Sequence, residues 1–248
     1  MILELSLFLV WGLMWAIYFV LDGFDLGIGI TLPFLGKTTG ERKVLINTMG
    51  PFWDGNEVWL IAAGAFTFGA FPIAYAKMFS LLYTPLMLLL FALILRGVSI
   101  EFRSKVADLK WMAFWEWVLF ISSFLAALLL GVAFSNIFRG LVFNGGEYAG
   151  TLSLFNPYGL LGGVLFVVIF VLHGLLWAGV KTNGEIHNRA VRAAKNIWPI
   201  VAIVAVAFLV FTWFDTKLYD KYLAYPVLLI VPVAAVAGIG RASCRERV

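Results

Sequence analysis

Runs of about 20 apolar residues, separated by short polar segments, recur along the whole chain. Because a helix needs roughly 20 apolar residues to cross the hydrocarbon core, each run predicts a transmembrane helix. Backbone groups in lipid must be hydrogen-bonded internally, and the period-2 alternation of barrel strands is not visible. We therefore predict an all-α polytopic transmembrane bundle with seven spans, at about residues 5–35, 57–76, 78–98, 112–134, 157–180, 197–214 and 222–240.

The spans are interpreted as one membrane domain over residues 1–240, followed by a polar tail at 241–248. Pro72 and Pro157 suit helix boundaries, because proline lacks the backbone N–H that a helix interior needs. Three further prolines fall inside spans and predict kinks. They are Pro85, Pro226 and Pro232.

Composition and charge support this architecture and orient it. The chain is 62% hydrophobic and only 13% charged, whereas about a quarter of the residues of a soluble domain are charged. Of its 18 Lys and Arg residues, 14 fall on one side of the predicted bilayer, which places the N-terminus outside by the positive-inside rule. The net charge of +4 is spread over short loops and does not indicate nucleic-acid binding. The single cysteine, Cys244, excludes an intrachain disulfide.

Four carboxylates lie inside or beside these apolar runs. Asp22 and Asp25 share a face of the first helix, and Asp54 and Glu57 share a face at the start of the second. All four are expected near the cytoplasmic side, because Asp25 lies about 30 Å along a helix that enters near Leu5. Carboxylates in a membrane usually handle ions or protons. The alternatives are solvated acids at a helix end for the first pair and a macrodipole-stabilised N-terminal cluster for the second.

Other polar residues in the spans favour structural interpretations. Arg96 either neutralises a buried acid or snorkels to the interface, and snorkelling is favoured. Glu116 is expected at the interface for the same reason. His173 is either a haem ligand or a packing residue, with packing favoured, and His187 lies in an inner loop. Neither cysteine-rich nor HExxH metal-site spacing is present, so we expect no metal in this chain.

Several longer strings carry a family resemblance. They are DGFDLGIG (22–29), GPFWDGNEVWL (50–60), RGVSIEFRSK (96–105), WEWVLFISSF (115–124), GVAFSNIFRG (131–140), NPYGLLGG (156–163) and TNGEIHNRA (182–190). In this order, over about residues 5–195, they closely resemble subunit II of the cytochrome bd-type quinol oxidases.

The resemblance implies a bacterial inner-membrane enzyme that oxidises quinol and reduces dioxygen to water, taking protons from the cytoplasmic side. Subunit I of this family carries haems b558, b595 and d and the quinol site, so none of these is expected in the present chain. Subunit II packs beside it as a heterodimer, helps to build the proton route and supports haem assembly. A small single-span subunit is a further expected partner.

By motif match, Asp25 and Asp54 fall on the acids associated with the family's proton pathway. Arg96 and Glu101 match the charged pair that follows, and Asp22 matches the first acid of DGFD; Glu57 joins them as a candidate from the residues alone. Family members usually have eight helices in two groups of four, whereas this sequence predicts a first group and a truncated second one. We interpret the tail, RASCRERV, as a truncated or altered end.

Two other classes of protein share some of these features. Secondary transporters also contain buried acids, glycine-interrupted helices and in-span prolines, but often show inverted repeats, which are not detected here. A purely structural membrane subunit would carry its acids solvated at the surface.

Overall fold

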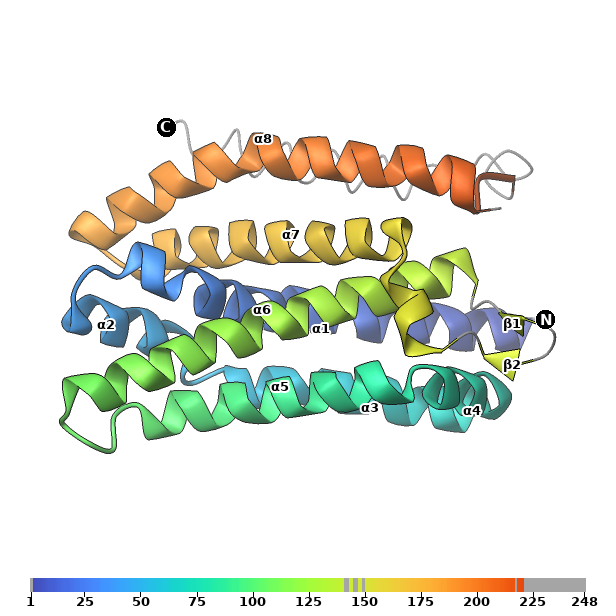
Figure 1. Cartoon of the computed structure of the whole chain (residues 1–248), viewed down its shortest axis with the longest axis horizontal. Coiled ribbons are helices and arrows are strands. Elements are labelled where there is room, and N and C mark those ends of the chain that lie inside the picture. The colour runs from blue at the N-terminus through green and yellow to red at the C-terminus, as the bar shows by residue number, and fades with distance from the viewer. Residues whose placement is uncertain (1, 141–142, 145–146, 149, 217, 221–248) are drawn as a thin grey trace.

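The computed structural model describes residues 2–140, 143–144, 147–148, 150–216 and 218–220, which form a bundle of helices running along one common axis (Figure 1). This architecture confirms the predicted all-α polytopic fold. Five of the described helices are long and apolar enough to cross a membrane. They are α1 (Ile2–Leu35), α5 (Tyr83–Phe102), α6 (Leu109–Arg139), α7 (Pro157–Lys181) and α8 (Gly184–Asp215).

The predicted count of seven spans is not confirmed. The predicted span at 222–240, with Pro226 and Pro232, and the tail at 241–248 lie outside the described residues. The predicted span at 197–214 is the second part of α8, whose first part extends the helix back through the polar segment 184–196.

The predicted spans at 57–76 and 78–98 have other boundaries in the structure. α3 (Trp53–Ala70) ends where Phe71 leaves the helical conformation, and Pro72 begins α4 (Pro72–Leu81). Proline is favoured at a first helical position, because the N–H that it lacks would have no intrahelical partner there. Pro85 lies in the first turn of α5, where the same reason applies, so the predicted mid-span kink is wrong. Pro157 begins α7, as predicted.

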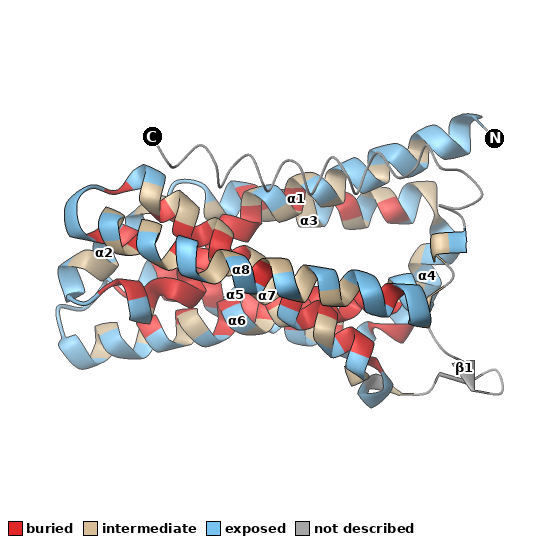
Figure 2. Ribbon diagram, turned by 90° about the horizontal axis from the view of Figure 1, so that it is seen from above, coloured by how far each residue is buried: buried red, intermediate tan, exposed pale blue. Residues whose placement is uncertain are grey.

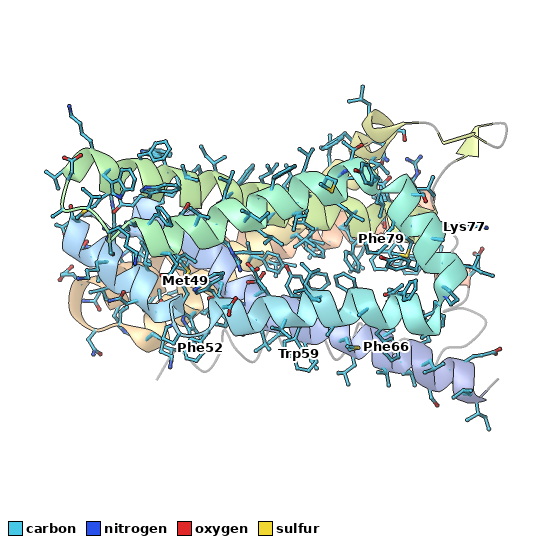
Figure 3. The ribbon with its side chains drawn as sticks, turned by 90° about the horizontal axis from the view of Figure 1, so that it is seen from below. Met49, Phe52, Trp59, Phe66, Lys77 and Phe79 are labelled. Carbon is cyan, nitrogen blue, oxygen red and sulfur yellow. The ribbon has the colours of Figure 1, made fainter. Side chains whose placement is uncertain are left out.

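The connections divide the bundle into two ends. One end, which we call the α2 end, carries α2 (Thr39–Met49), the α5–α6 connection and the α7–α8 turn (Figure 1). A capping box fixes the start of α2, since the Thr38 hydroxyl accepts from the Glu41 N–H and the Glu41 carboxylate accepts from the Thr38 N–H. Figure 3 shows Met49 and Phe52 toward this end and Lys77 at the opposite one.

The opposite end, which we call the N-terminal end, carries the start of α1, α4 and the short elements between α6 and α7 (Figure 1). These elements are the antiparallel strands β1 (Phe143–Asn144) and β2 (Glu147–Tyr148), and the 3-10 helix η1 (Thr151–Phe155). Burial is uneven between the ends: the first half of α1 is largely exposed, whereas residues 22–32 are all buried (Figure 2).

Glycines allow the close helix contacts that bury this part of α1. A Cβ on Gly27 would overlap the Phe170 carbonyl oxygen of α7, and one on Gly174 would overlap the backbone of Gly27. The α6–α7 crossing has the same form, with Gly131 against the Gly162 backbone. Small residues at such crossings let helix backbones approach closely in a membrane. One face of α1 therefore packs closely against α7. Asp22 and Asp25 lie on other faces of the helix.

Candidate functional site

Helix α1 buries Asp22 and Asp25 completely, on the side away from its glycine contacts. Positions 23 and 27 pack against α7, whereas Asp22 bonds to a residue of α5 and Asp25 to a residue of α3. Both aspartates have no exposed surface in the structure. The interpretation of these two acids as solvated at a helix end is therefore wrong: apolar residues continue past them, so the helix carries them into the bundle.

Arg96 of α5 lies at the centre of the site and has no exposed surface. Its Nη2 atom donates to Asp22 Oδ1 at 2.6 Å and to Glu57 Oε1 of α3 at 2.6 Å. The favoured prediction that Arg96 snorkels is wrong. Two carboxylates from neighbouring helices offer the guanidinium charged acceptors inside the bundle, and a buried cation needs such partners.

Asn56 holds the second aspartate. Its Nδ2 atom donates to Asp25 Oδ2 at 2.7 Å and to the Leu21 carbonyl oxygen at 3.0 Å, so both N–H bonds are used across the α1–α3 contact. We call Asp22, Asp25, Asn56, Glu57 and Arg96 the inner cluster. Asn56 is not among the candidate site residues predicted from the sequence; its place directly before Glu57 is the signal that joins it to the site.

The inner cluster is not fully satisfied by the protein. Four of its buried side-chain atoms have no hydrogen-bond partner within the described part of the chain: Asp22 Oδ2, Asp25 Oδ1, Arg96 Nε and Arg96 Nη1. Buried polar atoms without a protein partner are commonly satisfied by ordered water. Three carboxylates also face a single guanidinium here. The arrangement is suited to holding water and exchanging protons rather than only to joining helices.

Asp54 and Glu101 lie outside this buried cluster, with exposed side chains. Asp54 is in the first turn of α3, where its charge acts on Glu57. Glu101 and Glu57 line a groove of about 410 Å³ between α3 and α5, where the Trp53 ring closes on Gly97. The structure thus brings Asp22, Asp25 and Glu57 together and sets the two other acids at the surface next to them.

A second ionic cluster lies nearer the α2 end, and it was not anticipated. Glu116 of α6 is 4% exposed; its Oε1 accepts from Arg103 Nε at 2.9 Å and Nη2 at 2.6 Å, and its Oε2 accepts from Arg42 Nη1 at 2.6 Å. Arg103 Nη2 also donates to the Thr39 carbonyl oxygen, and Arg42 Nε to that of Gly36. We call Arg42, Arg103 and Glu116 the outer cluster. The prediction that Glu116 lies at the interface did not include these partners: two arginines meet its carboxylate, which is almost fully buried.

The two histidines stay apart from both clusters. The His173 ring lies 5.8 Å from the Phe24 ring, centroid to centroid, as expected for a packing residue. His187 Nδ1 lies 2.6 Å from the Gly179 carbonyl oxygen. Over the described ranges, no group of three or more His, Cys, Asp and Glu side chains is placed to hold a metal ion.

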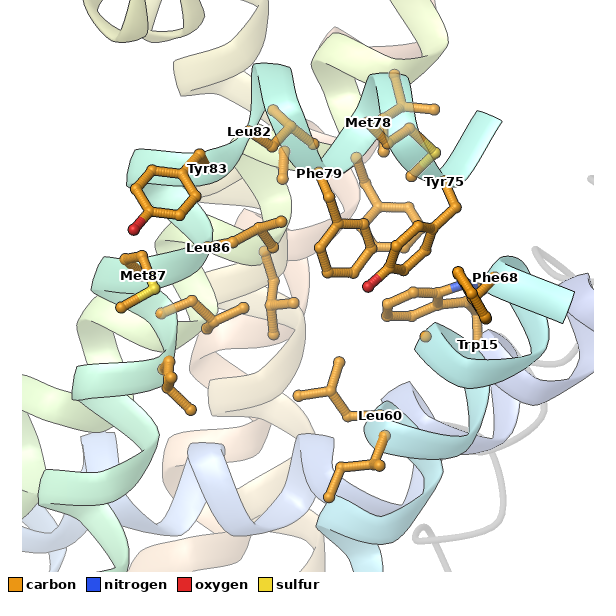
Figure 4. A pocket seen from close by; sticks show the side chains of 18 of the residues that line it. Trp15, Leu60, Phe68, Tyr75, Met78, Phe79, Leu82, Tyr83, Leu86 and Met87 are labelled. Carbon is orange, nitrogen blue, oxygen red and sulfur yellow. The ribbon is translucent and has the colours of Figure 1, made fainter. Parts of the chain in front are cut away.

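A larger apolar cavity of about 610 Å³ opens between α3, α4, α5 and α6 (Figure 4). Trp15, Phe68, Tyr75 and Phe79 lie around one side of it, and Leu86 and Met87 around the other (Figure 4). None of the described residues that line it is charged. It therefore offers packing for an apolar group but no proton-transfer chemistry.

Comparison with known sequences identifies the family. The sequence model of a family described as cytochrome bd terminal oxidase subunit II matches residues 3–247. This chain belongs to that family. The match confirms the resemblance carried by the motifs at residues 22–29, 50–60 and 96–105, and it extends well past residue 190, where the last quoted motif ends. Asp22 and Asp25 of the first motif, Glu57 of the second and Arg96 of the third meet in the inner cluster.

Relatives of known name agree with this family. The chain is 40% identical over 222 residues to the cytochrome bd ubiquinol oxidase subunit 2 of Bacillus subtilis, covering 87% of this chain and 66% of that protein. It is 41% identical over 194 residues to the cytochrome bd-I ubiquinol oxidase subunit 2 of Escherichia coli K12, covering 76% and 51%. A probable cytochrome oxidase subunit 2 of Haemophilus influenzae is 43% identical over 192 residues. The chain spans from half to about two thirds of the length of these relatives.

Proposed function

We propose that this chain is subunit II of a membrane quinol:dioxygen oxidoreductase, in which it delivers protons and supports assembly of a haem-bearing partner. The proposal rests on the family and on relatives named as ubiquinol oxidase subunits. Reduction of dioxygen to water consumes four protons for four electrons. A membrane-embedded reaction centre therefore needs a polar route through apolar protein, and a membrane carboxylate is the usual component of such a route.

The observation that carries the proton-delivery role is the inner cluster with its unpaired buried oxygens and nitrogens. Glu57 connects the cluster to the surface, since its side chain is 22% exposed and lines the α3–α5 groove together with Glu101. A proton can pass from the groove to Glu57, and from there through ordered water to Asp22 and Asp25, whose Oδ2 and Oδ1 atoms, respectively, have no protein partner within the described ranges. Arg96 stays protonated throughout and holds Asp22 and Glu57 in place through Nη2. The inner cluster contains three carboxylates and one guanidinium, so its negative charges outnumber its positive charge. Binding of one proton to a carboxylate reduces this excess.

The orientation follows from charge. The segments at the α2 end contain most of the basic residues of the described chain: Lys37, Arg42, Lys43, Arg103, Lys105, Lys110, Lys181, Arg189, Arg192 and Lys195. The positive-inside rule makes this the cytoplasmic end and puts the N-terminus outside, in the bacterial inner membrane. The inner cluster then takes its protons from the cytoplasm.

We place the haems b558, b595 and d and the quinol site in the partner, subunit I, which forms a heterodimer with this chain. A small single-span subunit is a further partner in the proposal. The exposed apolar side chains of the helices offer surface for both partners and for lipid, as at Phe91, Ile94 and Trp117.

Purification of the complex through a tag on this chain tests the assignment. We expect haem absorbance and quinol-dependent oxygen uptake to co-purify with it, and no haem when the chain is expressed alone. Haem bound to the chain alone would contradict the division of labour, and a complex without haem would favour a transporter. In the assembled complex, Asp54→Asn should slow oxygen uptake at unchanged haem content, because the Asp54 charge acts on Glu57, where the route begins. Unchanged turnover would show that Asp54 does not contribute to proton delivery.

A further inference from the structure

Two buried arginines, Arg96 of α5 and Arg103, the C-cap residue directly after α5, are 0% and 2% exposed. Arg103 keeps helical backbone angles, and its N–H bonds to the Ser99 carbonyl oxygen. Seven residues make nearly two helical turns, so both side chains leave the same face of α5, about 10 Å apart along its axis. Arg96 enters the inner cluster and Arg103 enters the outer cluster. The two ionic clusters are therefore joined through one rigid helical segment.

The inner hydrogen bonds of Arg96 depend closely on where α5 lies. A shift of α5 by one residue along its axis would move the Arg96 Cα by about 1.5 Å and turn it by about 100°. Either movement would break the 2.6 Å contacts from Nη2 to Asp22 and Glu57. At this level, Arg96 links α5 to α1 and α3, and the Trp53 ring of α3 lies against Gly97 of α5.

The outer cluster supplies a firm anchor two turns away. Glu116 accepts two hydrogen bonds from the planar fork of Arg103, which fixes the guanidinium in both position and rotation. The same carboxylate accepts from Arg42, and Arg103 also reaches the Thr39 carbonyl oxygen, so the end of α5 is tied to α6 and to α2 together. Without the Glu116 charge, two guanidinium groups would face each other across a buried space.

We propose that Glu116 is a positioning residue for proton delivery: by holding Arg103, it sets the register of α5 and so keeps Arg96 between Asp22 and Glu57. The inference rests on the proposed function of the inner cluster. Glu116 itself does not exchange the transported proton, because both its oxygens are held by arginines at the edge of the bundle.

The test uses the assembled oxidase complex with Glu116→Gln, which keeps the side-chain size but cannot accept from both arginines. Glu185→Gln, at an exposed position in the first turn of α8, is the matched control. Two quantities are measured: hydrogen–deuterium exchange of the amides at residues 97–105, and the pH dependence of quinol-driven oxygen uptake. Arg96→Lys, which keeps the charge but loses the planar fork, supplies the reference pH profile.

We expect Glu116→Gln to speed exchange at the end of α5 by about tenfold, the factor that corresponds to one lost charged hydrogen bond. It should also change the pH profile in the same direction as Arg96→Lys, and add nothing further when combined with it. Glu116→Asp, which keeps the charge on a shorter side chain, should restore part of both properties. The control should match the wild type.

Unchanged pH dependence in Glu116→Gln, or effects that add fully to those of Arg96→Lys, would overturn the positioning role. Should Glu116→Gln fail to assemble, Arg103→Lys replaces it, since lysine keeps the charge but cannot hold Glu116 through two nitrogens; an unchanged profile there has the same meaning. Failure of the proposed function would give a different result. Asp25 and Arg96 variants would then keep normal oxygen uptake, while hydrogen–deuterium exchange in α5 would still change in Glu116→Gln.

Discussion

The inner and outer clusters contain the same kinds of side chain but are satisfied to different degrees. In the outer cluster, two arginines share one carboxylate, and no buried side-chain atom of Arg42, Arg103 or Glu116 lacks a partner in the described structure. In the inner cluster, three carboxylates lie near one arginine that bonds to only two of them, and four buried atoms of Asp22, Asp25 and Arg96 have no partner among the described residues.

This difference separates a structural contact from a functional one. A network in which each atom is bonded rigidifies the helices that it joins, whereas unpaired polar atoms in a low-dielectric interior are costly and persist at sites with a function. The excess of negative charge in the inner cluster suits proton binding. The excess of positive charge in the outer cluster suits a fixed anchor at the predicted cytoplasmic end.

The largest expected effect is that of Arg96→Gln on the inner cluster. The substitution leaves Asp22 and Glu57 buried without their cation, which should cost about 3–5 kcal/mol of stability and most of the assembled complex. Thermal denaturation in detergent measures the loss. Arg139→Gln is the control, because its pair with Asp215 is about a third exposed on both sides and should contribute at most about 1 kcal/mol. Equal effects of the two variants would remove the distinction between buried and surface pairs.

Gly27→Ala tests the packing that holds the acids of α1 in place. The added methyl group would overlap the Phe170 carbonyl oxygen, so α1 and α7 must separate, at a cost of about 3 kcal/mol. Gly12→Ala, on the same helix with open space at the Cβ position, should leave the melting temperature unchanged or slightly higher. A normal melting temperature for Gly27→Ala would contradict the close α1–α7 contact.

Asn56→Ala addresses the hydrogen bond that holds Asp25. Loss of the Nδ2 donor leaves Asp25 Oδ2 and the Leu21 carbonyl oxygen without this partner, which should cost about 1–2 kcal/mol and lower oxygen uptake at unchanged haem content. Asn188→Ala, at an exposed position on α8, provides the comparison. If stability and turnover both matched the wild type, Asn56 would not hold Asp25.

The smallest effect concerns a surface contact at the α2 end. The Arg189 guanidinium and the Lys37 backbone N–H lower the pKa of the Glu41 carboxyl below its ordinary value of 4.5. A carboxyl whose pKa is depressed by folding adds stability above its unfolded pKa and loses it as the pH falls through the folded value. The wild type should therefore melt slightly above Glu41→Gln at pH 7, with the difference closing below pH 4.5. A difference that grew on acidification would contradict the pairing.

Sequence patterns predicted the apolar helices and the inner acids well, because membrane insertion depends on composition over about 20 residues. Pro72 lies at a helix boundary, as predicted, but Pro85 lies in the first turn of α5 instead of at a kink, since proline marks a helix start as readily as a kink. Arg96 and Glu116 were assigned to the interface because a single position cannot show which charge another helix will bring to it. Their partners, Asp22 and Arg42, are each 74 residues away in the chain.

The most direct test of the central claim is quinol-driven oxygen uptake by the purified complex carrying Asp25→Asn, with haem content measured in the same sample. Asp215→Asn, in the pair with Arg139 that is about a third exposed on both sides, is the control. The account predicts a full haem spectrum with turnover reduced about tenfold or more, because the amide keeps the shape of Asp25 but cannot carry a proton. Full haem content with wild-type turnover would contradict proton delivery through the inner cluster.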